Sequence, residues 1–160
     1  MDNKIRQIIL LVSILFTPMV QATAALTAIC YHDVKIIDQG DLDVDQYAIS
    51  PEHLLAQFEY IKANNFSPVS IDDLINAQKG NAPLPEKAVL LSFDDGYISF
   101  YSEVYPLLRL YNYPAVLAVV GSWLETSENE AVTYGNTQLD RAEFLSWRQM
   151  KEMQSSGLVE

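Results

Sequence analysis

Several features that would assign the chain to a particular class are scarce or missing from its 160 residues. Only one cysteine, Cys30, is present, so no disulfide can form within the chain. Lysine and arginine number 10 against 21 acidic residues and form no basic run, which argues against nucleic-acid binding. No glycine-rich phosphate loop occurs, so nothing supports a nucleotide site. The formal net charge of −11 tolerates neutral or cationic partners, such as sugars or amino sugars.

The N-terminus has the pattern of a secretory signal peptide. Lys4 and Arg6 precede an apolar run over residues 8–16, and Ala22-Thr23-Ala24 matches an Ala-x-Ala cleavage site. We therefore predict a signal peptide over residues 1–24 and a single exported domain over residues 25–160, because 49% hydrophobic residues suffice for one core. An uncleaved membrane anchor is the alternative, but the apolar run is short for a membrane-spanning helix.

The rest of the chain alternates predicted strands with predicted helices, which indicates an α/β fold with a parallel sheet. An open doubly wound sheet and a part of a barrel both fit this pattern. Two stretches, residues 35–49 and 122–139, lack a clear period, and we expect surface loops there. The strands are expected at 26–31, 66–69, 88–93, 114–120 and from 158 onward, and the helices at 51–63, 71–78, from near 102 to 111, and 147–155.

Two adjacent carboxylates follow the most apolar of these strands, residues 88–93. Like charges at contact distance repel unless a cation lies between them. One interpretation of Asp94-Asp95-Gly96 is therefore a metal site, in which one aspartate binds the ion and the other acts as a general base. The other interpretation is a simple turn whose aspartate caps the next helix.

The chain has only two histidines, and they fall in different settings. His32 ends the strand predicted over 26–31, so in a parallel sheet it lies at the same edge as Asp94 and suits a general acid. A histidine satisfied by local hydrogen bonds is the alternative. His53 lies in the predicted first turn of a helix, and we expect it on the solvated surface. Cys30 lies within an apolar run, which favours a buried, small hydrophobic role.

Five segments together resemble a known family. These segments are similar to the polysaccharide deacetylases, the NodB-homology or carbohydrate esterase 4 group. They are ICYHD at 29–33, LSFDDGY at 91–97, YPLL at 105–108, YPA at 113–115 and the closing segment 145–160. The Tyr-His-Asp motif precedes Phe-Asp-Asp-Gly, which resembles the circularly permuted branch that acts on exported poly-N-acetylglucosamine of biofilms. The resemblance covers essentially all of the chain after residue 24.

The resemblance implies a function and a role for each motif residue. The fold would be the N-terminal part of a distorted (β/α) barrel. The activity would be metal-dependent hydrolysis of N-acetyl groups from a poly-N-acetylglucosamine substrate, with a divalent ion such as zinc, nickel, cobalt or iron. Asp94 would be the catalytic base, Asp95 a metal ligand and His32 the general acid. The implied location is the periplasm or the periplasmic face of the outer membrane, with polysaccharide-export partners in the cell envelope.

One part of the family pattern is missing from these residues. The family completes its metal site with a His-Ser-x-x-x-His type pair after the strand that begins at Leu158, and a catalytic ion needs about three protein ligands. We therefore expect a truncated domain that is inactive by itself. Two other functions remain open: an exported glycan-binding or scaffold remnant that stacks sugars on Trp123 and the tyrosines, and a metal-dependent phosphatase built on Asp94 and Asp95. The lack of a phosphate loop or basic residues near the two aspartates weighs against the phosphatase.

Overall fold

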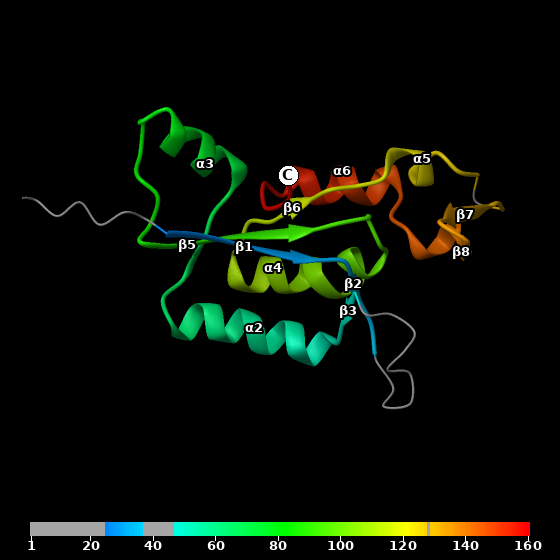
Figure 1. The fold of residues 1–160 in the computed structure, drawn as a ribbon, viewed down its shortest axis with the longest axis horizontal. Helices are drawn as coiled ribbons and strands as arrows, with labels where there is room; N and C mark the ends of the chain where they lie inside the picture. Colours follow the sequence, from blue (N-terminus) through cyan, green and yellow to red (C-terminus); the bar gives the residue numbers. More distant parts are fainter. Residues whose placement is uncertain (1–24, 37–46, 128) are drawn as a thin grey trace, which may run out of the picture.

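The structure, a computed structural model, describes residues 25–36, 47–127 and 129–160. Its centre is a parallel pair of seven-residue strands, β1 (Ala25–Tyr31) and β5 (Lys87–Phe93), shown in Figure 1. Two short strands also pair with β5 in parallel: β4 (Ser67–Pro68) near its beginning and β6 (Val116–Leu117) at its end. Because β1 runs along all of one edge of β5, β4 and β6 share the other edge. The predicted α/β class with a parallel sheet is confirmed.

The helices that follow the early strands begin where their capping residues predict. Helix α2 (Pro51–Ala63) is capped by Ser50, whose hydroxyl accepts from the His53 backbone N–H at 3.2 Å. Helix α3 (Ile71–Gln78) begins with a capping box between Ser70 and Asp73. His53 is exposed in the first turn of α2, as predicted.

The segment after β5 forms a helix of two kinds. A π-helical turn, η1 (Phe100–Val104), leads directly into α4 (Tyr105–Tyr111). Pro106 lies in the first turn of α4, where a missing N–H is tolerated. The expected interruption near this proline is the change from the π-helical turn η1 to the α-helix α4.

The last helix and the end of the chain also match expectation. Helix α6 (Trp147–Ser155) is capped by a box between Ser146 and Gln149. Val159 forms a parallel bridge with Ala115, and the Glu160 carbonyl accepts from the Leu117 N–H at 2.9 Å, so a further strand does begin beside β6. The Glu160 carboxylate also accepts from the Ile71 N–H at 2.9 Å, which ties this strand to the start of α3.

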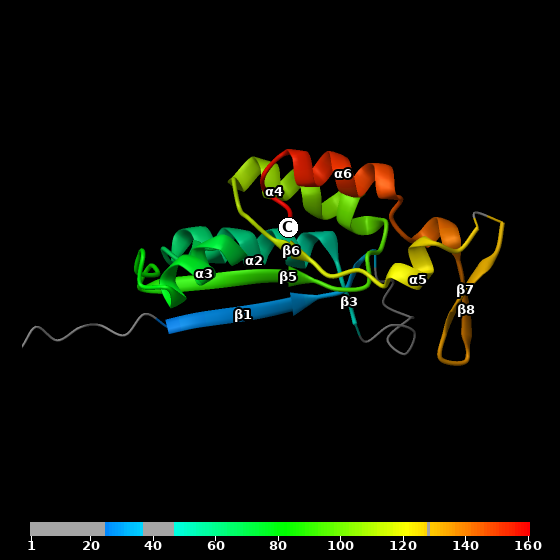
Figure 2. The ribbon, with the colours of Figure 1, turned by 90° about the horizontal axis from the view of Figure 1, so that it is seen from above.

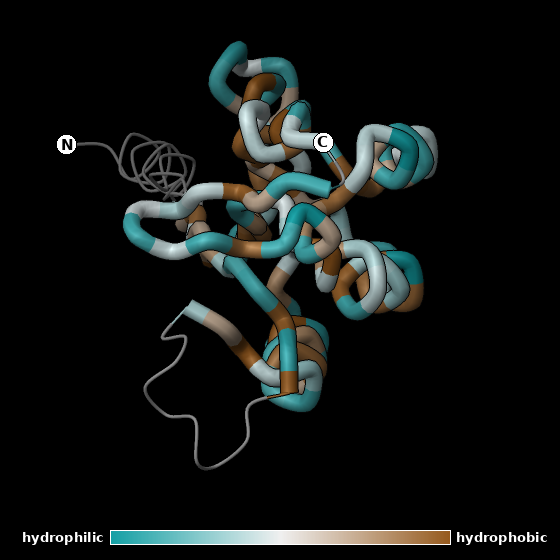
Figure 3. Tube along the Cα trace, turned by 90° about the vertical axis from the view of Figure 1, so that its right-hand side faces the viewer, coloured by the Kyte–Doolittle hydropathy of each residue, from teal (hydrophilic) through white to brown (hydrophobic). Residues whose placement is uncertain are grey.

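The described helices lie around the central strands and not on one side of them. In Figure 1, α2 lies below β1 and β5, whereas α3 and α6 lie above them, and in Figure 2, α4 and α6 lie on the side of β5 that is away from β1. The tube in Figure 3 shows hydrophobic and hydrophilic stretches alternating along the helices, as expected for helices that bury one face. The largest fully buried side chains of the core are Phe58, Phe93, Phe100, Leu54, Leu91 and Leu108.

Three sequence-based predictions are wrong in detail. The strand expected over residues 114–120 is reduced to β6, because only Val116 and Leu117 find ladder partners on β5. The loop expected over 35–49 ends in β3 (Ala48–Ile49), which pairs in parallel with β2 (Asp33–Val34). The loop expected over 122–139 contains a short helix, α5 (Gly121–Leu124), and an antiparallel hairpin of β7 (Ala131–Tyr134) and β8 (Thr137–Asp140), followed by a 3₁₀ turn, η2 (Arg141–Glu143).

The predicted signal peptide over residues 1–24 lies outside the described residues. Of the helices in the described ranges, none combines the length and the apolar character needed to cross a membrane.

Candidate active site

The β1–β5 register brings the two expected strand-end residues together. Tyr31 pairs with Phe93 at the last position of the ladder, so His32 and Asp94 are the next residues on adjacent parallel strands. The Asp94 N–H donates to the Tyr31 carbonyl at 2.8 Å, which continues the ladder one residue beyond β5. Both side chains are half-buried. The expectation that His32 and Asp94 lie at the same edge of the sheet is confirmed.

Alternation along the strands places two further polar side chains on the face that carries His32 and Asp94. Cys30 lies two residues before His32, and Ser92 two residues before Asp94, and Cys30 and Ser92 are paired in the ladder. The Cys30 thiol donates to Asp94 Oδ2 at 3.3 Å, and the Ser92 hydroxyl donates to Oδ1 at 3.3 Å. The prediction that Cys30 is buried is wrong, because Tyr31 takes the helix-facing position and Cys30 is exposed on the opposite face.

The Asp-Asp-Gly segment forms a tight turn in an unusual backbone conformation. Asp95 has φ 71° and Gly96 has φ 77°, and the Gly96 N–H donates to the Asp94 carbonyl at 2.9 Å. A positive φ is strained for most residues but tolerated by aspartate, so the turn accommodates the second carboxylate at some cost. Glycine is required at 96 for a second reason, since an added Cβ would lie 3.0 Å from Val119 Cγ1.

The electrostatics of the site follow from its partial burial. Burial raises the pKa of the Asp95 carboxyl; the charge of His32 opposes this rise and the charge of Asp94 adds to it. Burial also raises the pKa of the Cys30 thiol, and the hydrogen bond and negative charge of Asp94 raise it further. The site therefore holds two carboxylates, a histidine and a protonated thiol within mutual electrostatic reach.

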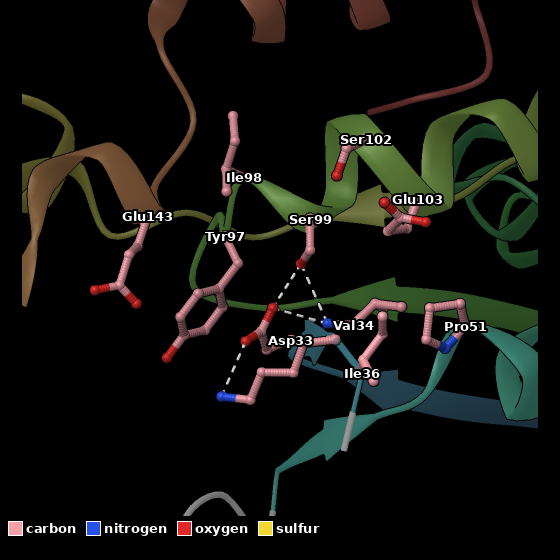
Figure 4. Close-up of a pocket in the computed structure, with 11 residues that line it drawn as sticks. Asp33, Val34, Ile36, Pro51, Tyr97, Ile98, Ser99, Ser102, Glu103 and Glu143 are labelled. Carbon is pink, nitrogen blue, oxygen red and sulfur yellow. Dashed lines mark hydrogen bonds and ion pairs between the residues drawn. The ribbon is translucent and has the colours of Figure 1, made fainter. Parts of the chain in front are cut away.

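A buried hydrogen-bonded pair connects the Tyr-His-Asp motif with the segment that follows Asp-Asp-Gly. Asp33 and Ser99 are buried, and the Ser99 hydroxyl donates to Asp33 Oδ1 at 2.6 Å. The same oxygen accepts from the Val34 N–H at 2.8 Å, while Oδ2 lies 3.4 Å from Lys35 Nζ. Figure 4 shows the Ser99 side chain pointing to Asp33 from the start of the helical segment after the turn. The strand after His32 is thereby joined to the chain after Asp95 and Gly96.

Beside this pair lies a cavity of about 380 Å³. Its polar lining includes Glu103 and Glu143 as well as Tyr97, which directly follows Gly96 (Figure 4). A neutral or cationic group suits such an acidic lining better than an anion does.

An aromatic cluster extends from the turn to the hairpin. Tyr97 stacks on Phe144 with ring centroids 5.1 Å apart, and Phe144 in turn lies 5.0 Å from Trp123. Trp123 packs edge-on against Tyr134 at 5.6 Å, and Tyr134 is exposed on β7. Trp123 and Tyr134, expected in a loop, thus belong to a packed unit next to the site.

The expected metal centre can be compared with the side chains present. One ligand atom from each of Cys30, His32 and Asp94 lies within 4.8 Å of the other two, whereas His53 is exposed in the first turn of α2. The charges of His32 and Asp94 act on the Asp95 carboxyl, but the described residues place no second histidine near it. They do not complete the Asp-and-two-histidine set that the family resemblance implies.

Sequence reasoning missed the parts of the site that depend on pairing. Cys30 and Ser92 belong to the site because of the β1–β5 register, and the spacing of two residues before each motif residue was the available signal. Ser99 reaches Asp33 because the chain turns at Asp95 and Gly96; a turn was one interpretation of this motif, but no local pattern indicates that Ser99 then meets Asp33.

The fold and sequence resemble known deacetylases. The chain is 42% identical over 135 residues to the poly-β-1,6-N-acetyl-D-glucosamine N-deacetylase of Escherichia coli K12, which covers 83% of this chain and 19% of that protein. The corresponding protein of Staphylococcus epidermidis is 23% identical over 140 residues, covering 82% of this chain and 45% of that protein. The chain thus spans about a fifth to under half of these relatives.

Solved structures give the same result. A de-N-acetylase from Aggregatibacter actinomycetemcomitans matches with a TM-score of 0.76 and 44% identity, covering 84% of this chain and 52% of that one. A deacetylase domain from Bordetella bronchiseptica matches with a TM-score of 0.69 and 34% identity over the same shares. Coverage of about half of each solved chain agrees with the expected partial barrel. The family model for polysaccharide deacetylase matches residues 81–160, half of the sequence, and the chain belongs to the polysaccharide deacetylase family.

Proposed function

We propose that this chain carries the acid–base half of a metal-dependent N-deacetylase that removes N-acetyl groups from an exported poly-N-acetylglucosamine. The observation that carries the proposal is the β1–β5 register, which sets His32 beside Asp94 at one sheet edge. Family membership and 42% identity to a poly-β-1,6-N-acetyl-D-glucosamine N-deacetylase support the reaction and the substrate class.

Each motif residue has a role that suits its surroundings. Asp94 acts as the general base, since its carboxylate reaches the open face of the sheet and is oriented by the Ser92 hydroxyl at 3.3 Å. His32, on the neighbouring strand, acts as the general acid that protonates the departing amine. Asp95 is the proposed metal ligand, held by the turn with the backbone hydrogen bond from Gly96 to Asp94.

The metal half of the site needs groups that the described residues lack. A divalent ion such as zinc, nickel, cobalt or iron would take Asp95 as one ligand, and about two further protein ligands are required. We therefore propose that the 160 residues alone release no acetate. The signal-peptide pattern of residues 1–24 supports export to the periplasm or the periplasmic face of the outer membrane, where polysaccharide-export proteins would be partners.

Acetate release tests the proposal. A chimera continues the chain after Glu160 with the part of the Aggregatibacter domain that this chain does not match, and is offered β-1,6-linked N-acetylglucosamine oligomers. We expect the chimera to release acetate, and both a chelator and Asp95→Asn to abolish release. Asp94→Asn should lower the rate by about 10²- to 10⁴-fold, the usual contribution of a general base.

The matched control is Asp72→Asn, an exposed aspartate in the first turn of α3, which should leave the rate unchanged. Equal activity of the unfused chain and the chimera would contradict the half-site proposal. Full activity of the Asp94→Asn chimera would contradict the proposed base.

A non-catalytic glycan-binding role is the second candidate, and the aromatic cluster of Trp123, Tyr134 and Phe144 favours it. Tyr134 is exposed and Trp123 is partly exposed, so these two rings can stack against sugars, while the buried Phe144 supports them from below. Oligomer binding that survives chelation and Asp94→Asn, is lost in Trp123→Ala and yields no acetate in the chimera would support this role over catalysis.

A further inference from the structure

Three different metal-ligating groups meet at the carboxyl end of the β1–β5 pair, on the face that carries the exposed Cys30. Cys30 lies on this face of β1, His32 directly follows the last residue of β1, and Asp94 directly follows the last residue of β5. Each offers one ligand atom within 4.8 Å of the other two, and Cys30 Sγ lies 3.3 Å from Asp94 Oδ2. Sulfur, nitrogen and carboxylate oxygen form a mixed set typical of zinc proteins.

The separations can be compared with those around a tetrahedral ion. Zinc–ligand bonds of about 2.3 Å to sulfur and about 2.0–2.2 Å to nitrogen or oxygen place neighbouring ligand atoms roughly 3.4–3.6 Å apart. The sulfur–oxygen distance of 3.3 Å already matches this spacing. The upper limit of 4.8 Å on the other distances leaves at most about 1.4 Å to close, which side-chain rotation can supply.

The donor set also selects among ions. A thiolate prefers soft or borderline cations such as Zn²⁺, Co²⁺ or Cd²⁺, whereas Mg²⁺ and Ca²⁺ prefer sites made of oxygen alone. Cys30 is exposed, so an ion can reach it from solvent, and water can take the fourth position. Binding replaces the thiol proton that now points to Asp94 and releases it to solvent.

We propose that Cys30, His32 and Asp94 form a binding site for one soft or borderline divalent cation, distinct from the ion that the proposed deacetylase would hold through Asp95. The consequence for catalysis rests on the proposed function: an ion here occupies the proposed base and the proposed acid together. In an enzyme that completes the site, such an ion therefore blocks N-deacetylation, and it is held through Cys30, a residue that the acid–base chemistry does not require.

Cobalt absorption tests the site directly, because Cys30 is the only cysteine and every thiolate-to-cobalt charge-transfer band must come from it. Co²⁺ is titrated into the full, reduced chain, followed by its near-ultraviolet absorption and by calorimetry. We expect one Co²⁺ per chain with a thiolate band, displaced by Zn²⁺ and insensitive to excess Mg²⁺. Cys30→Ser should abolish the band.

His32→Ala and Asp94→Asn should each weaken Co²⁺ binding at least about tenfold, since even an outer-shell partner contributes that much. His53→Ala, which removes the other histidine from the exposed start of α2, is the matched control and should change nothing. Circular dichroism of each variant checks that it is folded.

Three results would overturn the proposal: Co²⁺ bound without a thiolate band, a band shared between two chains, or affinity unchanged in folded His32→Ala and Asp94→Asn variants. An ion held only through Asp95 gives no thiolate band and is lost in Asp95→Asn. That result rejects this site and leaves the proposed deacetylase, which acetate release tests separately.

Discussion

The two faces of the β1–β5 pair are built for different purposes. The buried face, toward α2 and η1, carries Tyr31 and Phe93, stacked across the strands with ring centroids 4.8 Å apart. The opposite face carries the polar side chains of Cys30, Ser92 and Asp94, of which Cys30 is exposed and the other two are partly buried. The buried and the polar side chains alternate along the same two strands, so each polar residue is next in sequence to a buried one. The ladder that packs the core therefore also fixes the spacing of the reactive groups.

This arrangement makes the site a consequence of the core. The Tyr31 hydroxyl donates to Gln57 of α2 at 2.6 Å, and burial raises the pKa of Tyr31 to about 12, so this side chain stays neutral and anchored. A shift of the β1 register by one residue would exchange the two faces. Substitutions on each face should therefore differ mainly in their effect on the free energy of unfolding.

The largest difference in the cost of a substitution to the free energy of unfolding is expected between two neighbouring residues of β5. Phe93→Ala empties a fully buried site that contacts Tyr31 and Phe100, and should lower the free energy of unfolding by about 3–5 kcal/mol. Ser92→Ala removes one hydrogen bond on the open face and should cost about 1 kcal/mol or less. Urea unfolding measures both values, and similar costs for the two variants would show that the faces are not separate.

The turn that bears the carboxylates should be the next most sensitive element. Gly96→Ala combines a positive φ with a Cβ 3.0 Å from Val119 Cγ1, so we expect a loss of about 2–4 kcal/mol. Gly157→Ala is the matched control, because it has a similar φ of 75° and no heavy atom within 4 Å, and should cost about 1–2 kcal/mol.

Adding Val119→Ala to Gly96→Ala separates the two contributions to this loss. The smaller side chain removes the close contact, so the Gly96→Ala cost in that background should fall to that of Gly157→Ala. Equal costs with and without Val119 in a urea titration would show that close packing behind the turn is unimportant.

Local and long-range features of this chain differed in how far sequence could predict them. The helix starts at Ser50, Ser70 and Ser146 were predicted because an N-cap acts within three residues of itself. The meeting of His32 and Asp94 was predicted because parallel strands end at one edge. Both inferences need only a pattern and a general rule.

The features that were missed depend on which segments pair. The β7–β8 hairpin turns at Gly135-Asn136, a two-residue signal that the predicted loop over 122–139 obscured. Cys30 was expected to be buried because its neighbours are apolar, whereas the position of Tyr31 in the core decides which way the thiol points. Composition describes a stretch, but the face of a strand is set by the partner it packs against.

The hydrogen bond between Ser99 and Asp33 should show a smaller effect than the turn. Ser99→Ala leaves Asp33 Oδ1 with the Val34 N–H alone inside a buried site, and should cost about 1–3 kcal/mol. Ser102→Ala, an exposed serine lining the same cavity, should change stability by less than about 0.5 kcal/mol. Urea unfolding of both variants tests whether the link between the two motifs contributes to stability, and equal values would contradict it.

The smallest effect is expected far from both faces, in the capping box of α3. The Asp73 carboxylate accepts from the Ser70 N–H at 2.9 Å and from its hydroxyl at 2.7 Å, and these bonds hold the pKa of Asp73 below its ordinary value of 3.8. The stabilisation is complete above pH 3.8 and disappears as the pH falls through the lowered pKa. Asp73→Asn should therefore cost under about 1 kcal/mol at neutral pH and little at low pH.

Asp72→Asn is the matched control, because it loses the same helix-dipole interaction but no capping hydrogen bond. The difference in unfolding free energy between the two variants, measured by urea titrations across this pH range, gives the contribution of the capping box. A difference that persists below the lowered pKa would mean that the carboxylate charge is not what the cap requires.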